Sequence, residues 1–268
     1  TLFRLMNYIQ TNIKFSKKWF NPLYFILCEL LKEDSIRFIF IYGGKGSSKT
    51  VSIAQLLLKE ALIKKANSLS FRKESSRIKA SLKNSFNLAL DSMFIYPAFK
   101  KMEFSFVCNN GAELLMKGLD DSEKIKGIEG FKYLYIDEIN QFTNEEFNDC
   151  NMSLRGMLGQ KLIASWNPVD ERSWVKVDLI DTFDWVETNY KLPCENSFVK
   201  KSACGRAILI KTTYQDNYWI NGSPCKTYGF RDENLIKEYE ELRVTDYNKY
   251  KVNVLGEYGK SQFGGEFL

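Results

Sequence analysis

Residues 39–50, Ile-Phe-Ile-Tyr-Gly-Gly-Lys-Gly-Ser-Ser-Lys-Thr, decide the fold. Four apolar residues lead into a glycine-rich turn, and a Lys-Thr pair then opens a pattern of apolar residues with helical spacing. A buried strand, a glycine turn and a helix in this order predict a phosphate-binding loop. The glycines allow successive N–H groups to face one anion, and the following helix adds the positive end of its dipole.

The residues of this loop have separate expected roles. We predict a nucleotide-binding set made of Gly43, Gly44, Lys45, Gly46, Ser47, Ser48, Lys49 and Thr50. Lys49 is expected to reach the β- and γ-phosphates, and the Thr50 hydroxyl to coordinate Mg²⁺. Ser48 stands where the usual pattern G-x-x-x-x-G-K-[ST] has its second glycine. Because serine carries a Cβ, we expect φ below zero at Ser48 and an open anion cradle around Lys49.

A second apolar stretch, residues 131–136, ends in the acidic pair Asp137 and Glu138. The carboxyl ends of parallel strands are where such sheets bind ligands. We predict that Asp137 belongs to the Mg²⁺ coordination shell. Glu138 is the predicted catalytic residue, together with Lys49, and would orient and polarise a water for attack on the γ-phosphate.

A third apolar stretch, residues 161–166, continues into Asn167-Pro168. In a doubly wound sheet its polar end would lie beside the other two strand ends. Ser165 or Asn167 is therefore predicted to hydrogen-bond the γ-phosphate or the attacking water and so to sense the terminal phosphate.

The composition excludes several other classes of protein. The chain has no histidine, and its six cysteines are scattered without a C-x-x-C pair, which argues against a zinc site and excludes Ser-His and Cys-His nucleophiles. No apolar run is as long as a membrane span and no signal-peptide pattern is present, so we expect no membrane partner and a reducing cytoplasm. The net charge of +5 permits a polyanionic partner without establishing one.

The 268 residues suit one large α/β domain, or one domain with a small appendage. We expect a helical N-terminal segment over residues 1–35, an ATPase domain over residues 36–258, and the start of a linker over residues 259–268. Within the first segment, residues 23–31 have the spacing of an amphipathic helix, which would either bracket an adenine base or cover the sheet edge. Residues 104–116 predict a β-hairpin around Asn-Asn-Gly. Because the chain starts at Thr1, we expect it to be part of a longer product.

Taken together, these motifs resemble the ATPase domain of the large terminase subunit of tailed bacteriophages. The resemblance runs from about residue 20 to the C-terminus. The segments that carry it, in order, are Asn21-Pro22, Tyr42 with GGKGSSKT, Phe71-Arg72-Lys73-Glu74 with a Ser-Leu-Lys segment (residues 81–83) behind it, residues 118–127, the Asp-Glu strand, Ser165-Trp166-Asn167-Pro168, residues 213–217 and residues 255–259.

The resemblance implies an α/β P-loop NTPase of the additional-strand, catalytic-glutamate type, with a mostly parallel central sheet flanked by helices. It implies an ATP- and Mg²⁺-dependent motor that translocates double-stranded DNA into the procapsid. Such motors work as homo-oligomeric rings on the portal protein, are recruited by a small terminase subunit, and act in the cytoplasm of the infected bacterial host, transiently at the procapsid portal. A C-terminal nuclease domain also belongs to the family, and no nuclease activity is expected from this stretch.

Three basic residues are candidates for the inter-subunit arginine finger that the resemblance implies: Arg72, Arg77 and Lys126. The sequence does not choose among them. The basic residues Arg72, Lys73, Arg77, Lys79 and Lys83 are also candidates for DNA contact or form an ordinary solvated face.

Two other functions fit parts of the sequence. Another DNA-dependent P-loop ATPase or helicase would share the loop and Glu138 but not residues 118–127 and 213–217. A nucleotide-binding scaffold without hydrolysis is favoured by Ser48, but Glu138 argues against it because pure binding needs no acid that orients water.

Overall fold

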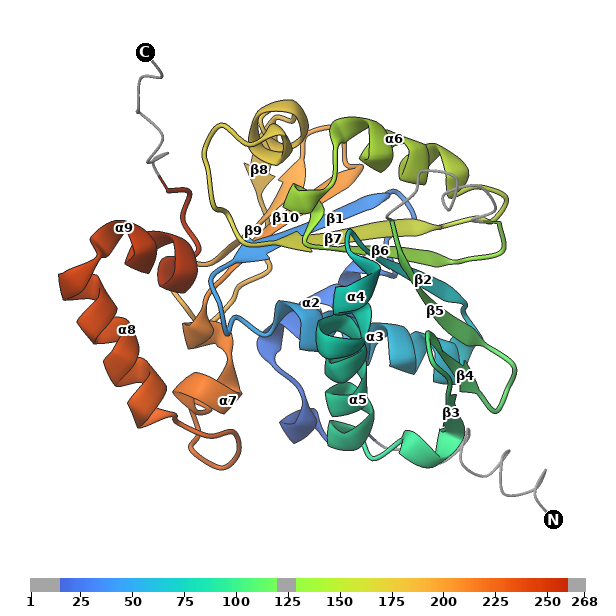
Figure 1. Ribbon diagram of the computed structural model, residues 1–268, viewed down its shortest axis with the longest axis horizontal. Coiled ribbons are helices and arrows are strands. Elements are labelled where there is room, and N and C mark those ends of the chain that lie inside the picture. The colour runs from blue at the N-terminus through green and yellow to red at the C-terminus, as the bar shows by residue number, and fades with distance from the viewer. Residues whose placement is uncertain (1–14, 120–128, 260–268) are drawn as a thin grey trace.

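The computed structural model describes residues 15–119 and 129–259. Within them, ten strands form one sheet in the order β3-β4-β5-β2-β6-β7-β1-β10-β9-β8 (Figure 1). The strands from β5 to β10 in this order run parallel, and antiparallel strands extend both edges. The strands are β1 (Phe38–Gly43), β2 (Ser68–Arg72), β3 (Phe99–Lys101), β4 (Ser105–Cys108), β5 (Glu113–Gly118), β6 (Tyr133–Asp137), β7 (Lys161–Trp166), β8 (Trp185–Glu187), β9 (Phe198–Ser202) and β10 (Ala207–Thr212).

Helical elements cover both faces of the sheet because its central strands are apolar on both sides. Ile39 and Ile41 of β1 pack into the core under α2 (Pro22–Leu30), α3 (Lys49–Lys64) and α5 (Lys83–Ser92). Phe40 and Tyr42 point the other way, into the core under α6 (Asn144–Ser153) and the π-helix η6 (Val175–Ile180). Figure 1 shows α3 and α5 on one side of the strands and α6 on the other.

The position of β7 confirms the predicted fold class. β7 pairs in parallel with β1 on one side and with β6 on the other, so it lies between the strand before the phosphate loop and the strand before the acidic pair. This is the additional strand of the predicted type. Its register sets Asp137 opposite Ser165 and Tyr42 opposite Trp166, which brings the three strand ends together.

Most local predictions are confirmed. The helix after the loop is α3, and residues 23–31 correspond to α2. β4 and β5 form the predicted antiparallel hairpin. Thr143 and Glu146 form a capping box that begins α6. The other helical elements are η1 (Lys17–Trp19), α4 (Ser75–Arg77), η2 (Ile78–Leu82), η3 (Tyr96–Ala98), η5 (Ile139–Gln141), η7 (Tyr214–Asp216), α7 (Tyr218–Asn221), α8 (Glu233–Thr245), α9 (Tyr247–Tyr250) and η8 (Lys251–Leu255).

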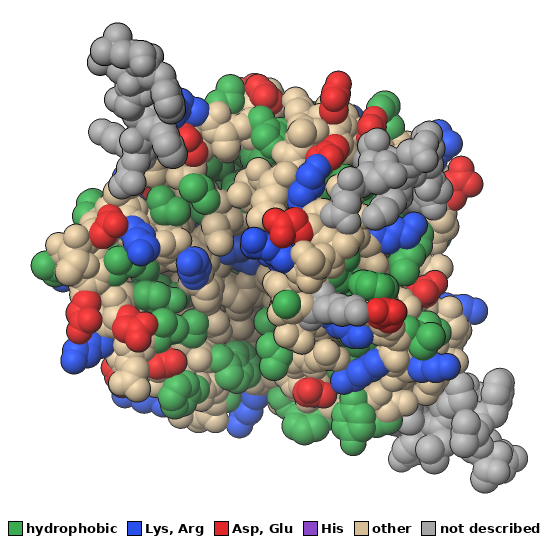
Figure 2. Space-filling model, in the orientation of Figure 1, with side chains coloured by type: hydrophobic (Ala, Val, Ile, Leu, Met, Phe, Trp, Pro, Cys, Tyr) green, Lys and Arg blue, Asp and Glu red, His purple; other side chains and the backbone are tan. Residues whose placement is uncertain are grey.

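The C-terminal helices have a small core of their own and lie against the phosphate loop. Tyr214, Tyr250 and Val254 form this core, with side chains of α8 packed on it. The Lys45 N–H donates to the Asn253 carbonyl, which ties η8 to the loop. The face drawn in Figure 2 is hollowed between these helices and the rest of the molecule. No helix within the described ranges is long and apolar enough to cross a membrane.

Candidate functional site

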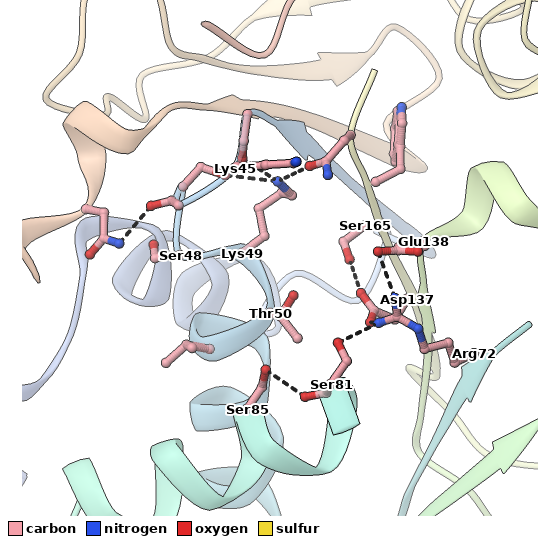
Figure 3. A pocket seen from close by; sticks show the side chains of 17 residues that line it. Lys45, Ser48, Lys49, Thr50, Arg72, Ser81, Ser85, Asp137, Glu138 and Ser165 are labelled. Atoms are coloured by element: carbon pink, nitrogen blue, oxygen red, sulfur yellow. Dashed lines mark hydrogen bonds and ion pairs between the residues drawn. The ribbon is translucent and has the colours of Figure 1, made fainter. Parts of the chain in front are cut away.

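A cavity of about 360 Å³ opens at the carboxyl ends of β1, β6 and β7. It brings together most of the predicted site. The lining residues are Gly44, Lys45, Gly46, Ser47, Ser48, Lys49, Thr50, Val51, Arg72, Ser81, Ser85, Asp137, Glu138, Ser165, Trp166, Asn167 and Asn217. Figure 3 shows Lys49 and Arg72 on opposite sides of this space. Gly43 ends β1 behind the lining, where a Cβ would collide with the Thr212 backbone.

Lys49 is folded against its own loop. Its Nζ lies 2.9 Å from the Gly43 carbonyl oxygen, 3.0 Å from that of Gly44, 2.9 Å from Ser47 Oγ and 3.0 Å from Asn167 Oδ1. Burial lowers the pKa of Lys49 from its ordinary 10.5 to about 7, while the nearby carboxylates of Asp137 and Glu138 oppose this shift. These four acceptors are neutral. A triphosphate would give the Lys49 ammonium an anionic partner in their place.

The expected backbone conformation of Ser48 was wrong. Its φ is 60° and its ψ is 9°, in the left-handed region, whereas we expected φ below zero. The turn from the loop into α3 needs a left-handed residue at this position, as glycine supplies in the usual pattern, and serine adopts that conformation despite its Cβ. Ser48 therefore has the left-handed conformation at the position where the usual pattern has glycine.

Arg72 ends β2 beside the acidic pair. Its side chain is 5% exposed, with Nη1 2.6 Å from Asp137 Oδ2 and Nη2 2.8 Å from Glu138 Oε1. Nη1 also donates to Ser81 Oγ at 2.8 Å, in the π-helix η2. Its Nε is buried without a hydrogen-bond partner among the described residues. One guanidinium thus holds both carboxylates within the same subunit (Figure 3).

Glu138 occupies a strained position at the end of β6. Its φ is 55°, which is rare for a residue with a side chain. Oε1 meets Arg72, and Oε2 accepts a hydrogen bond from Gln141 Nε2. The side chain is still 30% exposed, so water can reach it. Left-handed non-glycine residues occur preferentially at functional sites, and here two of them, Ser48 and Glu138, line one cavity.

The predicted phosphate sensors have different neighbours. Ser165 is buried and its Oγ lies 3.1 Å from Asp137 Oδ1 and 2.8 Å from the Tyr135 hydroxyl. Asn167 instead presents Oδ1 to Lys49. Ser165 therefore hydrogen-bonds the acidic pair through Asp137. Asn167 is the sensor candidate, because its hydrogen bond to Lys49 would be lost when Lys49 binds a phosphate.

Sequence reasoning missed several site residues. Asn217 lines the cavity, and its Nδ2 donates to the Gly46 carbonyl at 2.7 Å. Its Oδ1 accepts from Asn21 Nδ2 at 3.2 Å, which links the N-terminal segment to the loop. The adenine-bracketing role of that segment stays a prediction. Ser81 and Ser85 also line the cavity. Ser81 belongs to the Ser-Leu-Lys segment of the resemblance, without an assigned role, and lies within the π-helix η2, a form frequent at functional sites.

The other two finger candidates are Arg77 and Lys126. Arg77 is exposed and pairs with Glu74 three residues earlier, and it does not line the cavity. Lys126 lies outside the described residues, as does the side chain of Lys79. Of the other basic residues, Lys73 forms an ion pair with Glu146, and Lys83 donates to the backbone carbonyls of Met102 and Glu103.

The donor set at the cavity fits Mg²⁺. Thr50 and Asp137 present oxygen atoms, the ligand type that this ion prefers, and a nucleotide-dependent Mg²⁺ site needs only one or two protein ligands because phosphates and waters complete it. Within the described residues, no group of three or more His, Cys, Asp or Glu is placed to hold a metal ion by itself.

The sequence profile of the phage terminase large subunit family matches residues 35–257. The PBSX phage terminase large subunit of Bacillus subtilis (strain 168) is 22% identical over 223 residues, covering 82% of this chain and 49% of that protein. The large terminase subunit of Bacillus phage SPP1 is 23% identical over 262 residues, covering 91% of this chain and 54% of that protein. The chain therefore spans about half the length of these relatives.

Solved structures agree on the fold. The large terminase from a thermophilic bacteriophage superimposes with a TM-score of 0.62 at 16% sequence identity, covering 92% of this chain and 54% of that one. The same thermophilic phage protein has also been solved in complex with ADP and with ATP-γ-S, with TM-scores of 0.61 and 0.60.

Proposed function

The chain belongs to the phage terminase large subunit family, and we propose that it is the ATP-hydrolysing motor domain that translocates double-stranded DNA into a procapsid. The observation that carries this proposal is the single cavity that holds Lys49 together with Asp137 and Glu138. Lys49 and Asp137 serve the binding of Mg-nucleotide, whereas Glu138 is needed only for hydrolysis. The nucleotide complexes of the thermophilic phage terminase support ATP as the substrate.

Nucleotide binding would begin at the loop. The Lys49 ammonium exchanges the carbonyl oxygens of Gly43 and Gly44 for β- and γ-phosphate oxygens, and the N–H groups at the start of α3 face the same anion. Thr50 and Asp137 would hold Mg²⁺, which neutralises phosphate charge when it is bound. Asn167, freed from Lys49, can then donate its amide to the γ-phosphate.

Glu138 would act on the attacking water. Its carboxylate accepts a proton from the water as the water oxygen attacks the γ-phosphorus in line. The bond between the γ-phosphorus and the bridging oxygen then breaks and ADP leaves. Arg72 and Gln141 hold the two oxygens of this carboxylate, so its orientation is fixed before the substrate arrives. The Arg72 guanidinium also bridges the two carboxylates, with Nη2 on Glu138 and Nη1 on Asp137.

For the whole protein we propose the partners that its family implies. These are double-stranded DNA, a portal protein, a small terminase subunit and further copies of this chain in a ring, in the cytoplasm of an infected bacterium and transiently at the procapsid portal. Because a motor must grip every sequence in turn, its DNA contacts would be electrostatic and sensitive to salt.

A DNA-stimulated ATPase assay tests the proposal, with two variants as controls. Glu138→Gln should keep Mg-nucleotide affinity and lose about 10²–10⁴-fold in turnover, the range for a positioned general base. Asp137→Asn should weaken both metal-dependent binding and turnover. Turnover by Glu138→Gln at the parent rate would show that Glu138 is a bystander. Nucleotide binding by the parent without any hydrolysis would support the scaffold function instead.

A further inference from the structure

We propose that the hydroxyl group of Tyr135 positions the Mg²⁺ site, because it holds Asp137, one of the two side chains that would bind the ion. The inference rests on the proposed ATPase function and adds a residue that neither the phosphate loop nor the acidic pair contains. Tyr135 is a positioning residue: it acts through its neighbours and does not line the cavity.

Tyr135 lies in the middle of β6 with its side chain fully buried. Its hydroxyl oxygen is 2.8 Å from Asp137 Oδ1 and 2.8 Å from Ser165 Oγ. The hydroxyl therefore connects two neighbouring strands, β6 and β7, at the edge of the cavity.

Counting protons fixes the direction of these hydrogen bonds. A phenol carries one proton, and an ionised carboxylate can only accept. Tyr135 therefore donates to Asp137 Oδ1. The Ser165 hydroxyl donates to the same carboxylate oxygen at 3.1 Å, so two hydroxyl groups hold the orientation of this carboxylate. Partners of this kind orient metal ligands and typically account for 10–100-fold in metal affinity.

Tyr133 provides a matched control on the same strand. It lies two residues earlier, on the same face of β6, and is also buried. Its hydroxyl donates to a carboxylate as well, Glu60 Oε2 at 2.8 Å. Glu60 belongs to the far half of α3 and pairs with Lys59 and Lys64, so this hydrogen bond is remote from the cavity. Replacing either tyrosine by phenylalanine removes one buried hydroxyl and changes little volume.

The experiment titrates Mg²⁺ into each variant in the presence of a fluorescent ADP analogue, with a parallel measurement in EDTA. For Tyr135→Phe we expect the Mg²⁺ concentration at half-saturation to rise about 10–100-fold, with nucleotide affinity in EDTA unchanged. Tyr133→Phe should match the parent in both measurements. Thermal melting checks that both variants are folded.

A second variant keeps the test decisive if Tyr135→Phe loses stability. In an Asp137→Asn background the carboxylate that the hydroxyl orients is absent, so adding Tyr135→Phe should have a much smaller effect than it has alone. Equal effects in both backgrounds, or a Mg²⁺ curve for Tyr135→Phe that superimposes on that of Tyr133→Phe, would overturn the inference. If the parent itself bound no Mg-nucleotide, the proposed function would fail, which is a different result.

Discussion

Replacing Arg72 with alanine tests the charge arrangement on which the site depends. The guanidinium is the shared cation of Asp137 and Glu138, at 2.6 Å and 2.8 Å. Without it, two carboxylates on consecutive residues face each other at the end of β6. We expect Arg72→Ala to unfold more easily than the parent and to regain part of its stability from Mg²⁺.

The size of the loss follows from the exposure of each carboxylate. Removing one partner of a buried ion pair costs about 3–5 kcal/mol. The Asp137 side chain is 5% exposed and cannot be rehydrated, whereas that of Glu138 is 30% exposed and regains water. Because Asp137 keeps hydrogen bonds from Tyr135 and Ser165, we expect the lower end, about 3 kcal/mol. Mg²⁺ at ten times its Kd would return about 1.4 kcal/mol by mass action.

Urea unfolding in EDTA and in Mg²⁺ measures both effects, and Arg77→Ala is the control. The Arg77 side chain is 55% exposed and its partner Glu74 is 49% exposed. Loss of such a surface pair changes stability by no more than about 0.5 kcal/mol. If Arg72→Ala and Arg77→Ala unfold at the same urea concentration, and neither responds to Mg²⁺ more than the parent does, Arg72 does not bridge the acidic pair.

Two further predictions concern the loop. Ser48→Gly should be neutral or stabilise by up to about 1 kcal/mol, since glycine relieves the left-handed strain, whereas Ser48→Val should destabilise by more than about 1 kcal/mol; urea unfolding measures both. Because burial lowers the pKa of Lys49 from 10.5 to about 7, the folded protein binds fewer protons than the unfolded chain between these values. The buried ammonium therefore destabilises the fold fully below about pH 7, and this penalty disappears as the pH rises towards 10.5. A triphosphate restores the proton, so binding at about pH 8.5 should take up about one proton, measured by calorimetry in buffers of different ionisation enthalpy.

The parts of the molecule that could be predicted are those whose structure depends on residues close together in the sequence. The loop and α3 follow from the single stretch over residues 39–50, and the capping box of Thr143 and Glu146 spans a single turn. The position of Asp137 and Glu138 was predictable because an apolar strand that ends in acids sits at the ligand edge of a parallel sheet.

The contacts that were missed depend on strand order, which one sequence does not specify. Arg72 reaches Asp137 because β2 pairs with β6 in a register that sets Phe71 opposite Ile136. The same pattern in another sheet order would leave Arg72 exposed and available as a finger. Asn217 reaches Gly46 across 171 residues of chain. The conformation of Ser48 was missed for a different reason: residue type argued for negative φ, but the path into α3 required the opposite.

The charges of the cavity favour one more catalytic cation, which a neighbouring subunit would supply. Lys45, Lys49 and Arg72 line it together with Asp137 and Glu138, so its net charge is about +1, and Mg-ATP, at about −2, would make it negative. One more cation would therefore stabilise the charge that develops on the γ-phosphate.

Among the finger candidates, Arg72 is held by the carboxylates of its own subunit and is not available to a neighbour. Arg77 is exposed, and breaking its surface pair with Glu74 costs little. We therefore expect Arg77→Ala to lower ATP turnover and to regain part of its activity when mixed with Glu138→Gln subunits. An interface at which the Arg77→Ala subunit supplies Glu138 and the Glu138→Gln subunit supplies Arg77 holds one complete site. A mixture of Arg72→Ala and Glu138→Gln should regain no activity. Arg72 and Glu138 act together within one subunit, so a neighbouring subunit cannot replace either of them. If Arg77→Ala alone hydrolyses ATP at the parent rate, Arg77 is not the finger and Lys126 is the remaining candidate.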